Sequence, residues 1–132
     1  MRKQASLPGG DLEYAVLVAL WTLGTATARE VHDQVGAPKG LVYTTIAKVL
    51  DRLCAKELVS RQRGSKAFVF SARVKRDLID RARAKEAIGK LWSAEPRPAM
   101  ATLVDAVALH DPDLLDELAE AVDARRKARR GP

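Results

Sequence analysis

The sequence has one cysteine and no long apolar run, and each shortage excludes a class of protein. Cys54 stands alone among 132 residues, so one chain forms neither an internal disulfide nor a cysteine-based metal cluster. The longest apolar run, 14–21, is far shorter than the roughly 20 residues that cross a bilayer. The N-terminal segment MRKQASLPGG also lacks the apolar stretch of a signal peptide. A cytoplasmic protein is therefore expected.

Catalytic and metal-binding patterns are also missing from the sequence. No Ser/His/Asp group, glycine-rich phosphate loop or acidic pair stands at catalytic spacing, so an enzyme is not expected. We expect His32 to be exposed on a short helix and His110 to lie at a helix boundary. Neither histidine has a carboxylate or cysteine at metal-ligand spacing. No metal and no other cofactor is predicted, and Cys54 is expected to pack as a small apolar residue.

Positive charge is in excess and is unevenly distributed along the chain. Lys and Arg number 23 against 17 Asp and Glu, which gives a net charge of +6. Seven basic and two acidic residues lie within 39–66, whereas 97–124 holds one basic and seven acidic residues. Basic segments attract the phosphates of nucleic acids. The distribution favours one part that binds nucleic acid and another that contacts protein.

Capping signals predict two helices at the start of the chain. Asp11 is expected to cap a first helix that ends at Gly24. Thr27 and Glu30 have the spacing of a capping box, in which each side chain accepts a hydrogen bond from the backbone N–H of the other residue. We therefore expect a second helix over 28–35.

A third helix and a hairpin are predicted to follow. Apolar residues recur at helical spacing from Val42 to Leu53, after a turn that contains Pro38 and Gly40. Two short strands, 58–63 and 67–71, flank a polar turn. The expected fold is thus mainly α with a small β-hairpin wing: a winged helix-turn-helix followed by a helical dimerisation segment.

The remaining sequence predicts helices with unpartnered apolar faces. A basic helix is expected over 74–92, and Pro96 and Pro98 are expected to break it and keep the connection near 94–102 extended. Two one-sided helices follow, and we expect them to pair with a second copy of the chain. The predicted dimerisation residues are Met100, Leu103, Val104, Val107, Leu114, Leu115, Leu118 and Val122.

These patterns divide the chain into four expected parts. Residues 1–10 form a flexible N-terminus, 11–72 the winged helix-turn-helix, 73–124 the helical dimerisation domain and 125–132 a basic flexible tail. The tail is interpreted as a solvated end, with an arm that follows DNA as the alternative.

Residues 12–70 resemble the penicillinase repressor (BlaI/MecI/CopY) family of winged-helix regulators. Three blocks carry the resemblance, DLEYAVLVALW at 11–21, TAREVH at 27–32 and LVYTTIAKVLDRL at 41–53. It implies a homodimeric repressor that binds a palindromic operator in double-stranded DNA, with the third helix in the major groove. Family members respond to a membrane metalloprotease sensor, which leads to cleavage of the repressor, or to metal ions. Cleavage is expected near 94–102.

The sequence departs from the family pattern at two points. Glu57 stands where a glycine often follows the recognition helix, so the exit turn is expected to be different or strained. The cysteine-rich C-terminal metal site of the copper-responsive members is absent from this sequence. Copper sensing by that route is not expected.

The helical period turns the residues between the core positions of the third helix outward. We expect the threonines and Lys48 to contact base edges, and the other basic residues and Tyr43 to contact phosphates. The predicted DNA-binding residues are Lys39, Tyr43, Thr44, Thr45, Lys48, Arg52, Arg61, Arg63 and Lys66. Two alternatives stay open, a regulator that responds to a small molecule and a winged helix that binds an acidic protein partner.

Overall fold

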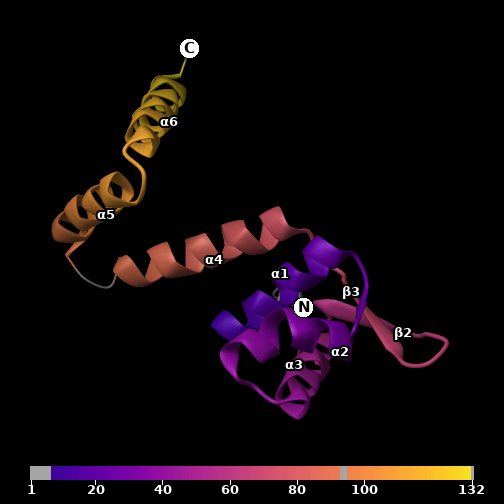
Figure 1. The fold of residues 1–132 in the computed structure, drawn as a ribbon. Helices are drawn as coiled ribbons and strands as arrows, with labels where there is room; N and C mark the ends of the chain where they lie inside the picture. The colour runs from indigo at the N-terminus through magenta and orange to yellow at the C-terminus, as the bar shows by residue number, and fades with distance from the viewer. Residues whose placement is uncertain (1–6, 93–94, 132) are drawn as a thin grey trace. The chain divides into compact units, whose positions relative to one another are not determined.

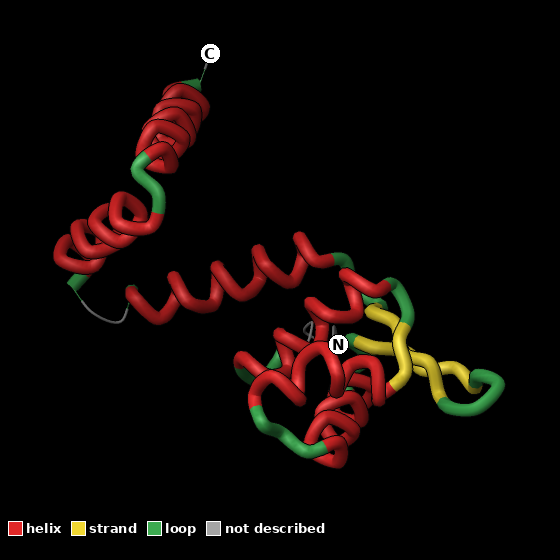
Figure 2. The backbone as a smooth tube through the Cα atoms, viewed as in Figure 1, coloured by secondary structure: helices red, strands yellow, loops and turns green. Residues whose placement is uncertain are grey.

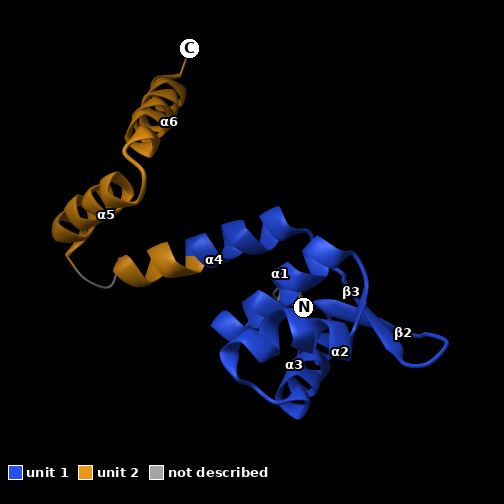
Figure 3. Ribbon diagram, viewed as in Figure 1, with its two compact units in different colours: residues 1–85 blue, residues 86–132 orange. Residues whose placement is uncertain are grey.

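The computed structural model describes residues 7–92 and 95–131 and divides the chain into two compact units, 1–85 and 86–132 (Figures 1 and 3). The first unit contains α1 (Asp11–Leu23), β1 (Ala26–Thr27), α2 (Ala28–Val31), a π-helical turn (His32–Gly36), a 3-10 turn (Ala37–Lys39), α3 (Tyr43–Ala55), β2 (Val59–Arg63) and β3 (Phe68–Ala72). Helix α4 (Arg76–Leu91) crosses the boundary, and the second unit contains α5 (Pro96–His110) and α6 (Asp113–Arg130).

The predicted ends of the first two helices are confirmed in part. Gly24 ends α1, but Gly10 precedes it, so Asp11 is the first helical residue and not the cap. The capping box is confirmed, because the Glu30 N–H donates to Thr27 Oγ1 over 3.2 Å and the Thr27 N–H donates to Glu30 Oε1 over 2.8 Å. The second helix is regular only to Val31 and then widens into the π-helical turn.

Close packing at Gly36 accounts for the irregular second helix. A Cβ atom there would lie 2.6 Å from His32 Cδ2 and 2.7 Å from Ile46 Cγ1, so only glycine allows this approach between the π-helical turn and α3. The prediction that His32 is exposed is wrong. Its ring is half-buried, and Nε2 lies 2.7 Å from the carbonyl oxygen of Leu41. His32 therefore stabilises the turn that precedes α3.

A three-stranded antiparallel sheet in the order β1-β3-β2 completes the first unit. The hairpin β2–β3 was predicted, but β1 was not, because two residues are too short to show the alternation of a strand. Figure 2 shows the sheet in yellow, with the hairpin extending beyond the helices. This arrangement is a winged helix-turn-helix.

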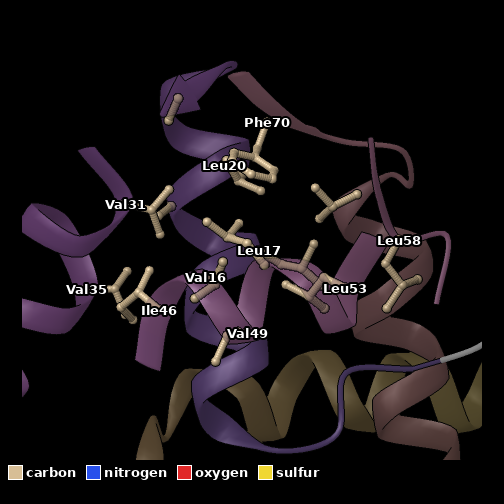
Figure 4. Close-up of a cluster of buried hydrophobic side chains, with 14 of the residues drawn as sticks. Val16, Leu17, Leu20, Val31, Val35, Ile46, Val49, Leu53, Leu58 and Phe70 are labelled. Carbon is tan, nitrogen blue, oxygen red and sulfur yellow. The ribbon is translucent and has the colours of Figure 1, made fainter. Parts of the chain in front are cut away.

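The core of the first unit lies between α1, α3 and the sheet (Figure 4). Leu17 and Leu20 of α1 meet Ile46, Leu50 and Leu53 of α3, and all five are almost fully buried. Phe70 of β3 and Val31 of α2 close the cluster. One side of α3 thus packs in the core, and its other side is accessible to a partner. Burial also raises the pKa of the half-buried Cys54 thiol, in keeping with the predicted packing role.

The chain leaves α3 through a left-handed residue, as the departure at Glu57 predicted. Glu57 has a φ of 63°, a region that costs a non-glycine residue about 1–2 kcal/mol. The following Leu58 N–H donates to the carbonyl oxygen of Leu53 over 3.0 Å and directs the chain into β2. The exit turn is therefore strained at Glu57, which is one of the two outcomes expected there.

The first half of α4 belongs to the first compact unit, which extends to residue 85, and the functional division at 72/73 stays a prediction. The Trp21 indole N–H donates to the carbonyl oxygen of Val74 over 2.9 Å, and the Tyr14 hydroxyl donates to Asp80 over 2.6 Å. Arg83 lies 3.7 Å from the centre of the Tyr14 ring. These contacts hold α4 against α1, with Ile79 buried in the core.

The second unit is helical, with two departures from expectation. Pro96 and Pro98 lie in the first turn of α5, where proline needs no N–H partner, so 96–102 is helical and not extended. Residues 93–94 lie outside the described residues. Helix α6 continues to Arg130, so the expected flexible tail is helical over 125–130. Pro112 is the N-cap residue of α6, and the Asp113 N–H donates to the side chain of Asp111 over 3.0 Å just before the helix.

The apolar residues of this unit remain accessible. Within the described parts of α5 and α6 no residue is buried, and Met100, Leu103, Val104 and Val122 are each at least two-fifths exposed. None of the described helices is long and apolar enough to cross a membrane.

Candidate nucleic-acid interface

Helix α3 presents a polar face opposite its core face. Thr44 and Lys48 are exposed at the centre of this face, whereas Thr45 is half-buried on its flank. Asp51 lies on the same face one turn beyond Lys48, a position that sequence reasoning did not assign. Hydroxyl, methyl, ammonium and carboxylate groups thus occur along one helix surface. This is the range of groups that reads base edges in a major groove.

The wing carries a second set of cations beside α3. The guanidinium of Arg61 lies 4.7 Å from the centre of the Phe68 ring and that of Arg63 lies 5.8 Å from it, so the aromatic ring supports both side chains. Lys66 is exposed in the hairpin turn. Such a pair of supported arginines suits the oxygen atoms of a phosphate backbone.

A glycine shapes the tip of the wing. The Gly64 N–H donates to the carbonyl oxygen of Ala67 over 2.9 Å and closes the turn. A Cβ atom on Gly64 would lie 2.6 Å from that same oxygen, so a larger residue would open the turn. The position of Lys66 therefore depends on Gly64.

An open groove of about 770 Å³ separates α3 from the wing, and we call it the wing groove. Its walls include Tyr43, Ala47 and Asp51 from α3, Arg29 from α2 and Lys66 from the hairpin. Arg29 lies 5.7 Å from the centre of the Tyr43 ring and adds a cation that the sequence did not single out. It lies in the capping-box segment, so its local pattern signals a helix start and gives no sign that α3 is its neighbour.

One ion pair links the two walls of the wing groove. Arg61 Nη1 lies 3.6 Å from Asp51 Oδ1, and both side chains are about half exposed or more. An exposed pair of this kind contributes little to stability. It does orient Arg61 towards α3, and it partly neutralises Asp51 on a surface that is otherwise basic.

Of the nine predicted site residues, four line the wing groove, three lie next to it and two lie elsewhere. Tyr43, Arg61, Arg63 and Lys66 line the wing groove, and Thr44, Thr45 and Lys48 lie next to it on α3. Lys39 is exposed in the turn before α3, and Arg52 lies on the opposite flank of the helix beside Glu13. Among the described residues, no group of three or more histidines, cysteines or carboxylates could hold a metal ion.

Glu13 ties the start of α1 to the end of α3. Its carboxylate accepts hydrogen bonds over 2.8 Å from Lys56 Nζ and from the Gly9 N–H, and its second oxygen lies 3.7 Å from Arg52 Nε. Burial raises the pKa of Glu13, but these hydrogen bonds and the two positive charges outweigh burial and lower the pKa below its ordinary value. The ionised carboxylate therefore holds Arg52 in place.

Glu13→Gln is expected to lower the free energy of unfolding by about 1–2 kcal/mol at pH 7. A carboxyl whose folded pKa lies below its unfolded value of about 4.5 stabilises the fold above that value, and the contribution is lost as the pH falls through the folded pKa. Urea unfolding at pH 7 and at about pH 3.5 measures the effect, and the two proteins should converge at the lower pH. A difference that is the same at both pH values would contradict this role.

The penicillinase repressor family model matches residues 9–124, which is most of the chain. The chain belongs to the penicillinase repressor family. The match includes both units, and therefore also the part of the chain where the sequence resemblance had no sharp motif. The copper-type cysteine site is missing from this penicillinase repressor family member, which has Cys54 alone.

Two curated relatives match about half of this family member. The transcriptional regulator BlaI of Mycobacterium tuberculosis, in strains H37Rv and CDC 1551, is 41% identical over 63 residues. The match covers 47% of this chain and 46% of BlaI, so the chain spans about half the length of the curated relatives it matches. These relatives are regulators and not enzymes.

Solved structures with a similar fold include the DNA-binding domain of the repressor BlaI. It matches at a TM-score of 0.49 and 20% identity, over 55% of this chain and 90% of that chain. The PcaV transcriptional regulator from Streptomyces coelicolor, solved with its natural ligand, matches at a TM-score of 0.47 and 22% identity, over 89% of this chain and 79% of that chain.

Proposed function

We propose that this protein is a transcriptional repressor of the BlaI type that binds double-stranded DNA through α3 and the wing. The observation that carries the proposal is the division of α3 into a buried core face and an exposed face with Thr44 and Lys48, beside a basic wing. In this arrangement α3 enters the major groove and reads base edges. Arg61, Arg63 and Lys66 hold the backbone phosphates, and Arg29 adds a further contact.

We further propose that the repressor is a homodimer on a palindromic operator. The support is the accessible apolar surface of α5 and α6, which has no core of its own among the described residues. Such a face is stabilised when a second copy covers it, and two-fold symmetry in the protein matches two-fold symmetry in the operator. The cytoplasm, where the DNA lies, is the expected location.

Inactivation by proteolysis through a membrane metalloprotease sensor stays a prediction that rests on family membership. The cut near 94–102 was expected because the prolines would keep this connection extended. That reason no longer holds, because residues 96–102 form the start of α5. A regular helix resists proteolysis better than an extended segment does. Cleavage within 96–102 would require α5 to unwind first.

Selection of binding sites from a genomic fragment library tests the proposed function. The full chain is incubated with fragments and an excess of random competitor DNA, and bound fragments are sequenced. Retention of a few promoters that share an inverted repeat supports a specific repressor. Retention in proportion to fragment length alone, at every salt concentration, would contradict sequence-specific binding.

A further inference from the structure

Val42 has an unusual position at the start of α3. It is the N-cap residue of the helix, with an extended backbone, and its side chain is 64% exposed. A valine side chain cannot accept a hydrogen bond, whereas Ser, Thr, Asp or Asn at an N-cap satisfies a free N–H of the first turn. The same chain places Thr27 at the N-cap of α2 and completes a capping box there.

Neither packing in the core nor capping of the helix explains a valine at position 42. The core of the unit is built from Ile46, Val49, Leu50 and Leu53 of the same helix, all fully buried, so Val42 adds nothing to it. At the N-cap a polar residue would stabilise α3 and would remove apolar surface from water. Val42 therefore costs stability twice, through the missing N-cap hydrogen bond and through exposed apolar surface. A binding partner that covers the side chain explains why an apolar residue stands there.

The place of Val42 in the fold identifies that partner. In a helix-turn-helix the N-terminal residues of the recognition helix contact base edges in the major groove. The apolar group on that edge of the duplex is the C5-methyl of thymine. Thr44, two residues further along, is exposed and carries a methyl group beside its hydroxyl.

We propose that Val42 contacts the C5-methyl of a thymine and so specifies that base at one position in each operator half-site. The inference rests on the proposed function, since it requires α3 to enter the major groove. It adds a specificity-determining residue beside the polar groups of Thr44 and Lys48. The contact is apolar and specific, because cytosine and deoxyuridine present no methyl group at this point.

Deoxyuridine scanning of the operator tests the contact. An operator selected with the wild-type protein is prepared with each thymine replaced in turn by deoxyuridine, which removes the methyl group and keeps base pairing. One position per half-site should weaken wild-type binding by about four-fold. Val42→Ala should bind the unmodified operator more weakly and should be less sensitive to deoxyuridine at that position, because only its Cβ methyl group remains.

Val42→Ser separates this role from a structural one. Serine restores the N-cap and removes both methyl groups, so thermal stability should rise by a few degrees while operator affinity falls and sensitivity to deoxyuridine disappears. Equal sensitivity of wild type and both variants at every thymine would overturn the thymine contact. Failure of the wild type to select any sequence would instead overturn the proposed function, so the two failures are distinguishable.

Discussion

Replacing Leu115 and Leu118 together by aspartate is expected to convert the proposed dimer into monomers and to weaken operator binding by about a hundred-fold or more. Both leucines are half-buried on α6, at helical spacing from Leu114 and Val122. Two charges on this face would have to lose their hydration when a second copy docks, which costs several kcal/mol per ion. The monomer keeps one half-site contact and loses the gain from tethering two.

A matched control tests whether the effect depends on where the two charges are placed or only on the added charge. Ala106→Asp with Ala124→Asp adds the same two charges at exposed positions of α5 and α6 outside the predicted dimerisation face. Sedimentation at micromolar concentration should show a dimer for the wild type and the control, and a monomer for the leucine variant. A leucine variant that stays dimeric, or that binds the operator as tightly as the control, would contradict the assignment.

The parts of the fold that follow from local chemistry could be predicted from the sequence. The capping box at Thr27 and Glu30 depends on neighbouring residues alone, and it forms as expected. The core stripe of α3 has a clear helical period from Ile46 to Leu53, because one side of the helix is buried and the other is not. Periodicity reports burial, so it also identified the opposite, polar face.

Tertiary contacts decided what the sequence did not reveal. The two residues of β1 become a strand because Ala26 and Thr27 pair with Phe70 and Val69, which are more than forty positions away. The first half of α4 joins the winged-helix unit through a hydrogen bond from Tyr14 to Asp80, and polar partners leave no periodic signal. Proline was interpreted as a breaker, although the first turn of a helix accepts it.

The candidate site likewise contains residues that local sequence reveals and residues that only tertiary contacts reveal. The outward position of Thr44 and Lys48 could be predicted, because both share one face within a single helix. Arg29 was missed, since it reaches the wing groove only when α2 packs beside α3 and brings it 5.7 Å from the centre of the Tyr43 ring. Asp51 was missed because an acidic residue is unexpected on a surface that meets phosphate, and its pairing with Arg61 depends on the hairpin folding back towards α3.

Lys48→Ala and Lys66→Ala are expected to weaken DNA binding in different ways. Lys48 is exposed on α3, where its ammonium group is predicted to contact guanine acceptors, so its loss should cost about 1–3 kcal/mol on the operator and relax preference at one base position per half-site. Lys66 is exposed in the wing, where its ammonium group is predicted to contact phosphate. Its loss should weaken operator and scrambled DNA about equally.

Salt titration distinguishes the two roles. If each Lys66 neutralises one phosphate, Lys66→Ala should make the log-log salt slope of the dimer shallower by about 2. Arg63 is predicted to act in the same way, but Lys66 gives the cleaner test because Arg63 also lies against the Phe68 ring. Lys85→Ala removes one positive charge from α4, outside the wing groove, and serves as the matched control.

The geometry of the operator gives an independent check on the same assignment. Two recognition helices related by a two-fold axis enter the major groove on one face of the duplex, so half-site centres should lie about 10 to 11 base pairs apart or a small multiple of that distance. Footprinting with the wild type and Lys48→Ala should show the same spacing, with weaker protection in the variant. Equal loss of specificity in Lys48→Ala and Lys66→Ala, or an unchanged salt slope for Lys66→Ala, would mean that the base-reading and phosphate-binding surfaces are assigned wrongly.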